Sequence, residues 1–211
     1  MMENRKQKVV IIDYGMGNIG SIDNMLKFLG VKAVISSDIN TILNADKIIL
    51  PGVGHFDRAM TNIKSLGLLD VIKEMALVKK KPFLGICLGM QIMCESSDEG
   101  VLPGLSLVQA EVKKFDFGLD SKLKVPHMGW NTIRINKSST ILDGLNDNSR
   151  FYFVHSYYVK CQNEMNVLTK TTYGFDFVSS FEVNNLIGAQ FHPEKSHRFG
   201  VNLFKNFLEK Y

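Results

Sequence analysis

Short, almost wholly apolar segments alternate with helical patterns over residues 1–96, and this alternation limits the fold more than any other feature. Each apolar segment is short and bounded by turn residues, as expected for a strand covered on both faces of a sheet. Parallel strands joined by helices form a doubly wound α/β sheet. The expected strands are residues 8–13, 31–36, 45–50 and 82–86, and the expected helices are residues 19–29, 56–65 and 68–79.

The pattern changes after residue 100, where apolar and polar residues alternate between turn residues. Such alternation predicts antiparallel hairpins with one covered face, added to the largely parallel central sheet. A buried strand and an amphipathic closing helix then end the chain. The expected strands are residues 106–115, 130–136, 150–160, 166–172, 177–183 and 186–191, and the expected helix is residues 196–211.

Size and composition describe an ordinary globular chain of 211 residues, enough for one sizeable core. No linker rich in Pro, Gly or Ser divides it, so we expect residues 1–211 to form one domain. The net charge of +4 comes from scattered lysines, which predicts no nucleic-acid surface. No apolar run approaches the roughly 20 residues of a membrane span, and the first run is too short for a signal peptide. We therefore expect a cytoplasmic protein without a membrane contact.

The cysteine count gives no sign of a disulfide framework or a zinc site. There are three cysteines, Cys87, Cys94 and Cys161, without paired spacing. Cys94 follows Cys87 at about two helical turns and is expected to face the core. We expect neither a metal nor a cofactor.

Cys87 stands where an apolar strand meets a helical pattern, with glycines two residues away on each side: Gly85-Ile-Cys87-Leu-Gly89. This is the spacing of a nucleophile elbow, with cysteine in place of serine. A strand that turns sharply into a helix crowds its neighbours, so small residues are needed there. The competing interpretation is a buried core cysteine after a buried strand.

A second candidate group ends the last predicted strand, where Phe191 is followed by His192-Pro193-Glu194. In an extended segment, residues two apart point the same way, so His192 and Glu194 would project together. Pro193 favours extended geometry for the residue before it. A carboxylate beside an imidazole fixes its tautomer and stabilises the imidazolium, which can then take a proton from a thiol.

Together these residues predict an acyl-transfer triad at the carboxyl ends of two strands. Cys87 would be the nucleophile, His192 the general base and later the general acid, and Glu194 the residue that orients it. Leu88 N–H, at the start of the helix, is the expected first oxyanion donor. The peptide between Gly52 and Val53, in the glycine-rich loop after the strand at residues 45–50, is the candidate for the second.

The motifs GICLGMQ, PGVGHF and HPEKS together resemble the class I, triad-type glutamine amidotransferase family. The start IDYGMGN and the segment VPHMGWN narrow the resemblance to the glutaminase subunits of imidazole glycerol phosphate synthase, from about residue 9 to the last helix. The resemblance implies that glutamine is hydrolysed and that ammonia passes to a separate (β/α)₈-barrel synthase subunit in histidine biosynthesis, which makes imidazole glycerol phosphate and AICAR.

The resemblance also implies roles for individual residues. It places contacts to the glutamine substrate on Gly52, Gln91, Glu99, Ser156 and Tyr157, and a carboxylate such as Glu99 suits an α-ammonium group. It implies a heterodimer with the partner subunit, and the residues that would face this partner are Asn18, His127, Trp130 and Asn131. The glycines of the loop at Gly52 and Gly54 would permit a peptide flip when the partner binds substrate.

Three other functions stay open on the sequence alone. Close relatives of this family direct ammonia to a sugar in surface-polysaccharide synthesis, and genomic neighbours would discriminate that acceptor. A cysteine peptidase of related fold fits Gln91 and the His-Pro-Glu arrangement less well. A catalytically inactive scaffold subunit conflicts with an intact set of Cys87, His192 and Glu194, and loss of activity with a glutamine-analogue alkylator would exclude it.

Overall fold

The computed structural model describes residues 7–118 and 121–211. Its main sheet has the strand order β2-β1-β3-β4-β13-β12-β10-β6-β5, with β11 and β8 branching from β12. Strands β2, β1, β3, β4 and β13 are mutually parallel, and β13 pairs with β12 antiparallel. The expected doubly wound, largely parallel sheet with an antiparallel addition is confirmed.

The elements have these bounds in the parallel half: β1 Val9–Ile12, α1 Ile19–Phe28, β2 Val34–Ser36, α2 Ile39–Leu43, β3 Lys47–Leu50, α3 Phe56–Ser65, α4 Leu68–Lys73, β4 Phe83–Ile86 and α5 Leu88–Ile92. Those that follow are β5 Ser96–Ser97, β6 Ala110–Lys114, β7 His127–Thr132, β8 Arg134–Ile135, β9 Arg150–His155, β10 Tyr157–Cys161, β11 Val167–Tyr173, β12 Phe175–Val183, β13 Leu186–Ala189 and α6 His197–Lys210.

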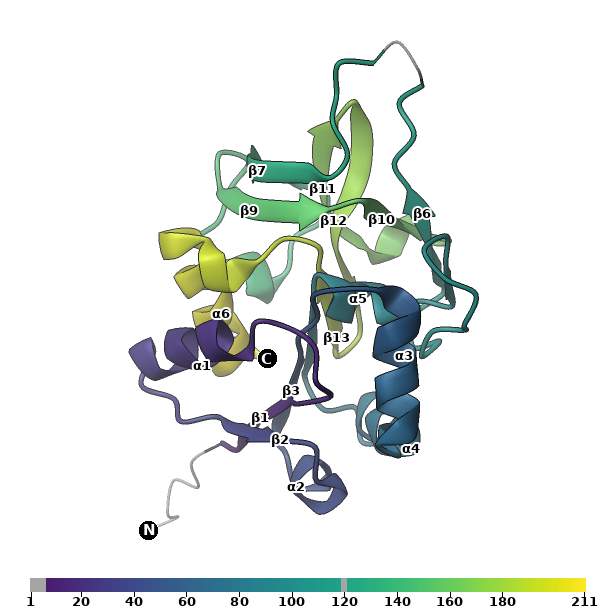
Figure 1. The fold of residues 1–211 in the computed structure, drawn as a ribbon. Coiled ribbons are helices and arrows are strands. Elements are labelled where there is room, and N and C mark those ends of the chain that lie inside the picture. Colours follow the sequence, from purple (N-terminus) through teal and green to yellow (C-terminus); the bar gives the residue numbers. More distant parts are fainter. Residues whose placement is uncertain (1–6, 119–120) are drawn as a thin grey trace.

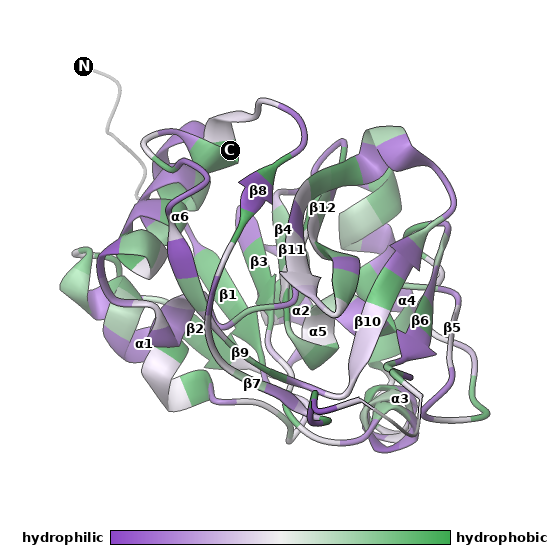
Figure 2. Ribbon diagram, turned by 90° about the horizontal axis from the view of Figure 1, so that it is seen from above, coloured by the Kyte–Doolittle hydropathy of each residue, from purple (hydrophilic) through white to green (hydrophobic). Residues whose placement is uncertain are grey.

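Two helical layers cover the parallel strands, α1 and α6 on one face and α3, α4 and α5 on the other (Figure 1). Alternate residues of β1 point to opposite layers: Val10 and Ile12 pack with the α3–α5 layer, and Val9 and Ile11 pack with α1 and α6. Burial on both faces explains why these strands are continuous apolar runs, visible as green arrows in Figure 2.

A buried lysine fixes the end of α6 against the sheet. Lys47, 1% exposed at the start of β3, donates from Nζ to the carbonyl oxygens of Phe207, Leu208 and Tyr211 at 2.8, 2.7 and 2.5 Å. Burial lowers the pKa of Lys47. An ammonium group at a helix C-terminus satisfies carbonyls that have no partner within the helix.

Several boundaries differ from the sequence-based expectation. Residues 31–33 lie outside β2, and the expected helix 68–79 is α4 followed by a π-helical turn at Glu74–Val78. The short elements α2 and β5 were not expected. Cys94 lies beyond the end of α5 but is fully buried, as expected for a core residue.

The expected strand 150–160 is two strands that belong to different sheets. β9 pairs with β7 in a separate two-stranded sheet, whereas β10 pairs with β6 and β12 in the main sheet. The chain changes sheet at Ser156, between them. This break places the corner between β9 and β10 beside the carboxyl ends of the parallel strands, where it lines a pocket.

Candidate active site

Three loops meet at one edge of the sheet because they follow three neighbouring parallel strands. β4 lies between β3 and β13, so Cys87 is flanked by the loop that begins at Pro51 and by the segment that leads to His192. Ligand sites in open α/β sheets form at this edge. A cavity of about 240 Å³ lies there, and its walls are Val53, Gly54, Cys87, Leu88, Gln91, Glu99, Pro126, Val154, His155, Ser156, Tyr157 and His192.

Cys87 adopts the strained backbone of a nucleophile elbow, with φ 53° and ψ −110°. Its N–H donates to Ala189 O of β13 at 2.7 Å, so the strand pairing holds the residue in this conformation. Leu88 begins α5, and its N–H therefore has no acceptor within the helix. Cys87 is 7% exposed and lines the cavity, so the sulfur is buried without being sealed.

The two glycines of the elbow are required by close packing. A Cβ on Gly85 would lie 2.5 Å from Met93 Sδ and 2.9 Å from the Gly89 carbonyl, and a Cβ on Gly89 would overlap the Leu50 carbonyl oxygen. Backbone atoms cannot move aside as a flexible side chain can. The spacing Gly-x-Cys-x-Gly thus lets α5 begin directly against β3.

The glycine-rich loop after β3, from which the second oxyanion donor was expected, packs against the start of α5. A Cβ on Gly52 would lie 2.5 Å from Gly89 N and 2.7 Å from Leu88 Cβ, so this loop is in direct contact with the start of α5. Val53 is 47% exposed and Gly54 has φ +122°; both line the cavity. The peptide between Gly52 and Val53 is therefore beside the first residue of α5.

His192 and Glu194 form a buried pair: Nδ1 lies 2.7 Å from Oε1, and their side chains are 2% and 1% exposed. The expectation that they meet along an extended segment was wrong, because Glu194 lies in a 3₁₀ turn, Pro193–Lys195. The turn folds the carboxylate back onto the ring. Ser196 Oγ fixes it by donating to His192 O at 2.6 Å and accepting from Tyr152 N at 3.0 Å.

The electrostatics of the pair favour a protonated ring. Burial lowers the pKa of His192, but hydrogen bonding and charge from Cys87 and Glu194 outweigh it and raise the pKa to about 10. His192 Nε2 has no hydrogen-bond partner among the described residues. Cys87 and His192 line the same cavity, and Cys87 contributes to the raised pKa of the His192 ring. The arrangement therefore places a proton-carrying imidazole at the same cavity as the Cys87 sulfur.

The residues expected to contact substrate lie around the same cavity, apart from Gly52, whose neighbour Val53 lines it. Gln91 Nε2 donates to Tyr157 O at 3.1 Å, which fixes its amide in the wall. Glu99 is half-buried, and its Oε2 accepts from Phe56 N at 2.9 Å, at the start of α3. One carboxylate oxygen of Glu99 thus caps a helix.

Two polar residues of the site were missed from the sequence. Gln190 is fully buried and donates from Nε2 to Cys87 Sγ at 3.7 Å, and His155 lines the cavity. The alternation used for His192 could have found Gln190, because it stands two residues earlier in the same extended run. Nothing in the local sequence marks His155, whose role depends on pairing between β7 and β9.

The residues expected to face a partner are distributed over two regions. Asn18 is half-buried at the start of α1, in the loop whose Gly17 touches Pro51 and Gly52. On β7, Trp130 is 46% exposed, whereas His127 is 3% exposed and lies beneath the surface. Asn131 is half-buried and its Nδ2 contacts His127 Nε2 at 3.3 Å.

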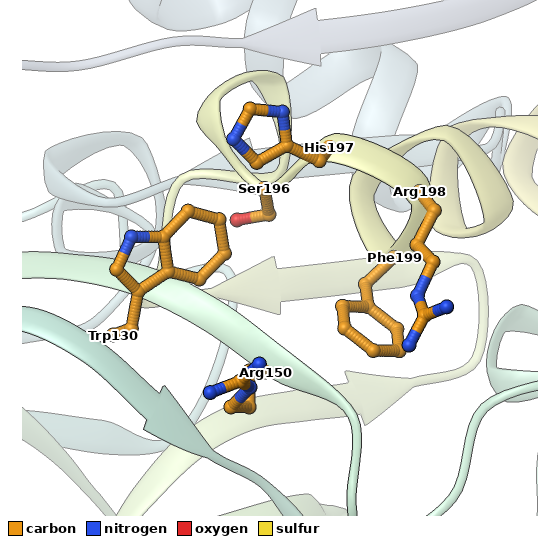
Figure 3. A pocket seen from close by; sticks show the side chains of 6 residues that line it. All are labelled: Trp130, Arg150, Ser196, His197, Arg198 and Phe199. Carbon is orange, nitrogen blue, oxygen red and sulfur yellow. The ribbon is translucent and has the colours of Figure 1, made fainter.

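The Trp130 side chain lies beside a second cavity of about 440 Å³, which residues of β7, β9 and the start of α6 line (Figure 3). Its indole stacks on His197 at the start of α6, with centroids 5.4 Å apart and planes 6° from parallel. Arg150 and Arg198 line the same cavity. The outer face of β7 therefore presents a fixed aromatic surface with cationic neighbours.

Over residues 7–118 and 121–211, no cluster of three or more His, Cys, Asp or Glu side chains is placed to hold a metal ion. In the same residues, no helix has the length and apolar character needed to cross a membrane.

Comparisons with known proteins agree on one family. Residues 10–211 match the family described as "Glutamine amidotransferase class-I". The chain is 50% identical to imidazole glycerol phosphate synthase subunit HisH 2 of Methanococcus maripaludis, over 96% of this chain and 99% of that protein. It is 47% identical to the HisH 2 subunit of Pseudomonas aeruginosa over 95% and 98%, and 46% identical to the HisH subunit of Aquifex aeolicus over 96% and 97%.

Solved structures show the same fold at lower identity. A putative GMP synthase protein from Thermoplasma acidophilum superposes with a TM-score of 0.72 at 20% identity, covering 96% of this chain and 92% of that one. A protein described as glutamine amidotransferase superposes with a TM-score of 0.70 at 18% identity, covering 95% and 97%.

Proposed function

The chain belongs to the class I glutamine amidotransferases and, within them, to the HisH subunits of imidazole glycerol phosphate synthase; from this premise we propose a glutaminase mechanism at Cys87. Glutamine is hydrolysed to glutamate and ammonia, and the ammonia passes to a (β/α)₈-barrel synthase subunit. That partner uses it to make imidazole glycerol phosphate and AICAR in histidine biosynthesis, in the cytoplasm.

The buried pair of His192 and Glu194 beside Cys87 carries this proposal, because it supplies every proton transfer that amide hydrolysis needs. The Cys87 thiolate attacks the side-chain amide carbon of glutamine. Imidazolium at His192 then gives its proton to the departing nitrogen, so that ammonia leaves and a thioester remains. Neutral His192 next takes a proton from water, and the hydroxide attacks the thioester. Glutamate leaves and gives its acid proton to solvent, and Cys87 is again a thiolate beside imidazolium at His192.

The developing oxyanion requires donors at the start of α5. Leu88 N–H is the first, and the peptide between Gly52 and Val53 is the second, supported by its contact with Leu88 and Gly89. Each donor of this kind contributes about 2.7–4 kcal/mol to transition-state stabilisation in enzymes with an oxyanion hole.

Substrate specificity follows from the polar groups around the cavity. The free oxygen of Glu99 would hold the α-ammonium group, and Ser156 and Tyr157 would hold the α-carboxylate. Gln91 Oε1 remains available to the substrate, because its Nε2 is used in the wall.

The partner would bind over β7 and the start of α1. Trp130 offers an exposed aromatic surface, and Asn18 adjoins the loop that contacts the oxyanion peptide. His127 would act indirectly, by holding Asn131. Delivery to a bound partner is needed because free ammonia at neutral pH is mostly ammonium, which is not nucleophilic.

The test is glutamate release from glutamine by the purified chain, alone and with a candidate barrel partner and its ligand, with Cys87→Ala as the control. Turnover that rises with the histidine-pathway partner and vanishes in the control is expected. If turnover rises only with a synthase that transfers ammonia to a sugar, the partner belongs to surface-polysaccharide synthesis and not to the histidine pathway. Turnover that survives in Cys87→Ala would overturn the mechanism.

A further inference from the structure

Gln190 contacts the sulfur of the candidate nucleophile and is not part of the expected triad. It follows β13 directly and is fully buried. Its Nε2 donates to Cys87 Sγ at 3.7 Å, and its Oε1 accepts from Gln91 Nε2 at 3.0 Å. A buried amide without hydrogen bonds destabilises the fold. The two contacts satisfy both the NH₂ group and the oxygen of the Gln190 amide.

The orientation of the Gln190 amide follows from its neighbours. Tyr157 O is a carbonyl and can only accept, so Gln91 must present its nitrogen there, at 3.1 Å. That same nitrogen faces Gln190, which must therefore present its oxygen. The remaining end of the Gln190 amide, its NH₂ group, is then directed at the sulfur. A flipped amide would place an oxygen against a thiolate.

The chain of hydrogen bonds continues from Tyr157 O to β7. His155 Nδ1 donates to this carbonyl at 2.8 Å, so a neutral His155 must accept at Nε2. His127 Nδ1 lies 3.0 Å from that nitrogen and is thus the donor, which leaves His127 Nε2 to accept from Asn131 Nδ2. The direction of donation is the same at every step from Asn131 to Tyr157.

Burial keeps both rings of this chain neutral. It lowers the pKa of His155 to about 3 and the pKa of His127 to about 4. Each neutral imidazole has one donor and one acceptor, and the neighbours use both. His127 also stacks on Tyr173, with centroids 4.1 Å apart, so the ring has little freedom to turn.

We propose that Gln190 is a hydrogen-bond donor to the Cys87 thiolate, and that the hydrogen bonds from Asn131 through His127 and His155 hold in place the Tyr157 carbonyl that accepts from Gln91. The inference rests on the proposed function only in taking Cys87 as the nucleophile. Hydrogen bonds to charged groups are stronger than those to neutral groups, so the amide favours the thiolate over the thiol. This series of hydrogen bonds begins at Asn131 on β7, the strand that also carries Trp130 of the expected partner face.

The first test removes the donor with Gln190→Met, which keeps the length of the side chain. The rate of Cys87 alkylation by iodoacetamide is followed against pH by mass spectrometry of its peptide, which needs no glutamine. The midpoint of this profile should rise by about one pH unit, the size expected for a lost charge-assisted hydrogen bond. Gln109→Met, at an exposed position, is the matched control and should leave the profile unchanged.

A companion variant, Gln190→Glu, keeps the shape and adds a carboxylate beside the sulfur, so its midpoint should rise further. Glutaminase kinetics of the same variants should show kcat lowered about tenfold, with KM within about a factor of two. A wild-type alkylation profile in both folded Gln190 variants would overturn the contact. If the wild-type protein has no glutaminase activity, the proposed function is overturned instead. Alkylation reports the contact between Gln190 and Cys87 without any need for that activity.

The second test interrupts the series of hydrogen bonds far from Cys87. His127→Phe keeps a ring against Tyr173 but removes both nitrogens. His155 then loses its donor, and the Cys87 alkylation midpoint should rise by a smaller amount. Its effect should be less than additive with Gln190→Met, because both act through one amide. His197→Phe, on the outer side of β7, is the control. Additive effects, or a wild-type profile in His127→Phe, would overturn the proposed support by the chain.

Discussion

Replacing Glu194 by glutamine tests how much of catalysis depends on charge rather than on geometry. The carboxylate lies 2.7 Å from His192 Nδ1, and both side chains are almost fully buried, so solvent does not screen the interaction. The amide oxygen of Glu194→Gln can still accept from the ring at this distance. What it cannot supply is the negative charge that stabilises the imidazolium.

The expected loss follows from the difference between a charge-assisted and a neutral hydrogen bond, about 1.5 kcal/mol. This corresponds to roughly a tenfold fall in kcat/KM for glutamine. Glu194 Oε2 has no hydrogen-bond partner among the described residues, so the new NH₂ group replaces an atom that is also unpaired. The free energy of unfolding should therefore change less than the activity.

Glutamate release measured across pH 6 to 10 is the assay, with Glu209→Gln at an exposed position of α6 as the control. Glu194→Gln should lose activity at the alkaline end first, because the pKa of His192 falls when the charge is removed. An unchanged rate and pH profile would refute the reasoning, and so would an equal loss in the control.

The remaining predictions concern packing and protonation. Gly89→Ala places a methyl group against a backbone oxygen of β3 and should lower the free energy of unfolding by about 1–3 kcal/mol in urea denaturation; a neutral effect would contradict the packing argument. Lys47→Met leaves three carbonyls at the end of α6 without a donor and should cost about 2–3 kcal/mol in the same measurement, whereas Lys205→Met on the exposed side of α6 should not. Cys87→Ala should lower the pKa of His192 from about 10, as seen in an NMR titration of the ring. Protonated His192 contributes stability that is complete below its ordinary pKa of 6.5 and is lost as pH rises through about 10, so wild-type stability should fall in this window more than that of Cys87→Ala.

The elements that the sequence predicts well are those whose local signals agree with their surroundings. The strand before Cys87 and the helix Phe56–Ser65 have bounds close to those expected, because burial and periodicity point to the same structure. The expected strand 150–160 is divided at Ser156, because which sheet each half joins depends on distant partners. Local alternation contains no information about that choice.

The site shows the same division between local and distant information. Glycine spacing around Cys87 predicts the elbow, because the close contacts that require glycine lie within one strand–helix unit and its neighbour strand. The pairing of His192 with Glu194 was predicted for the wrong reason, since a 3₁₀ turn brings them together. His155 was missed because its part in the wall depends on β7 and β9 meeting across 28 residues of sequence.

The covalent state of Cys87 during turnover tests the central claim most directly. The protein is mixed with glutamine and quenched in acid within one turnover. After digestion, mass spectrometry measures the masses of the peptides that contain Cys87, Cys94 and Cys161. We expect a γ-glutamyl thioester on Cys87 alone, and none in His192→Ala, because without the imidazole no group protonates the departing nitrogen. Glutamine turnover without any acyl group on Cys87, or with the group on another cysteine, would contradict it.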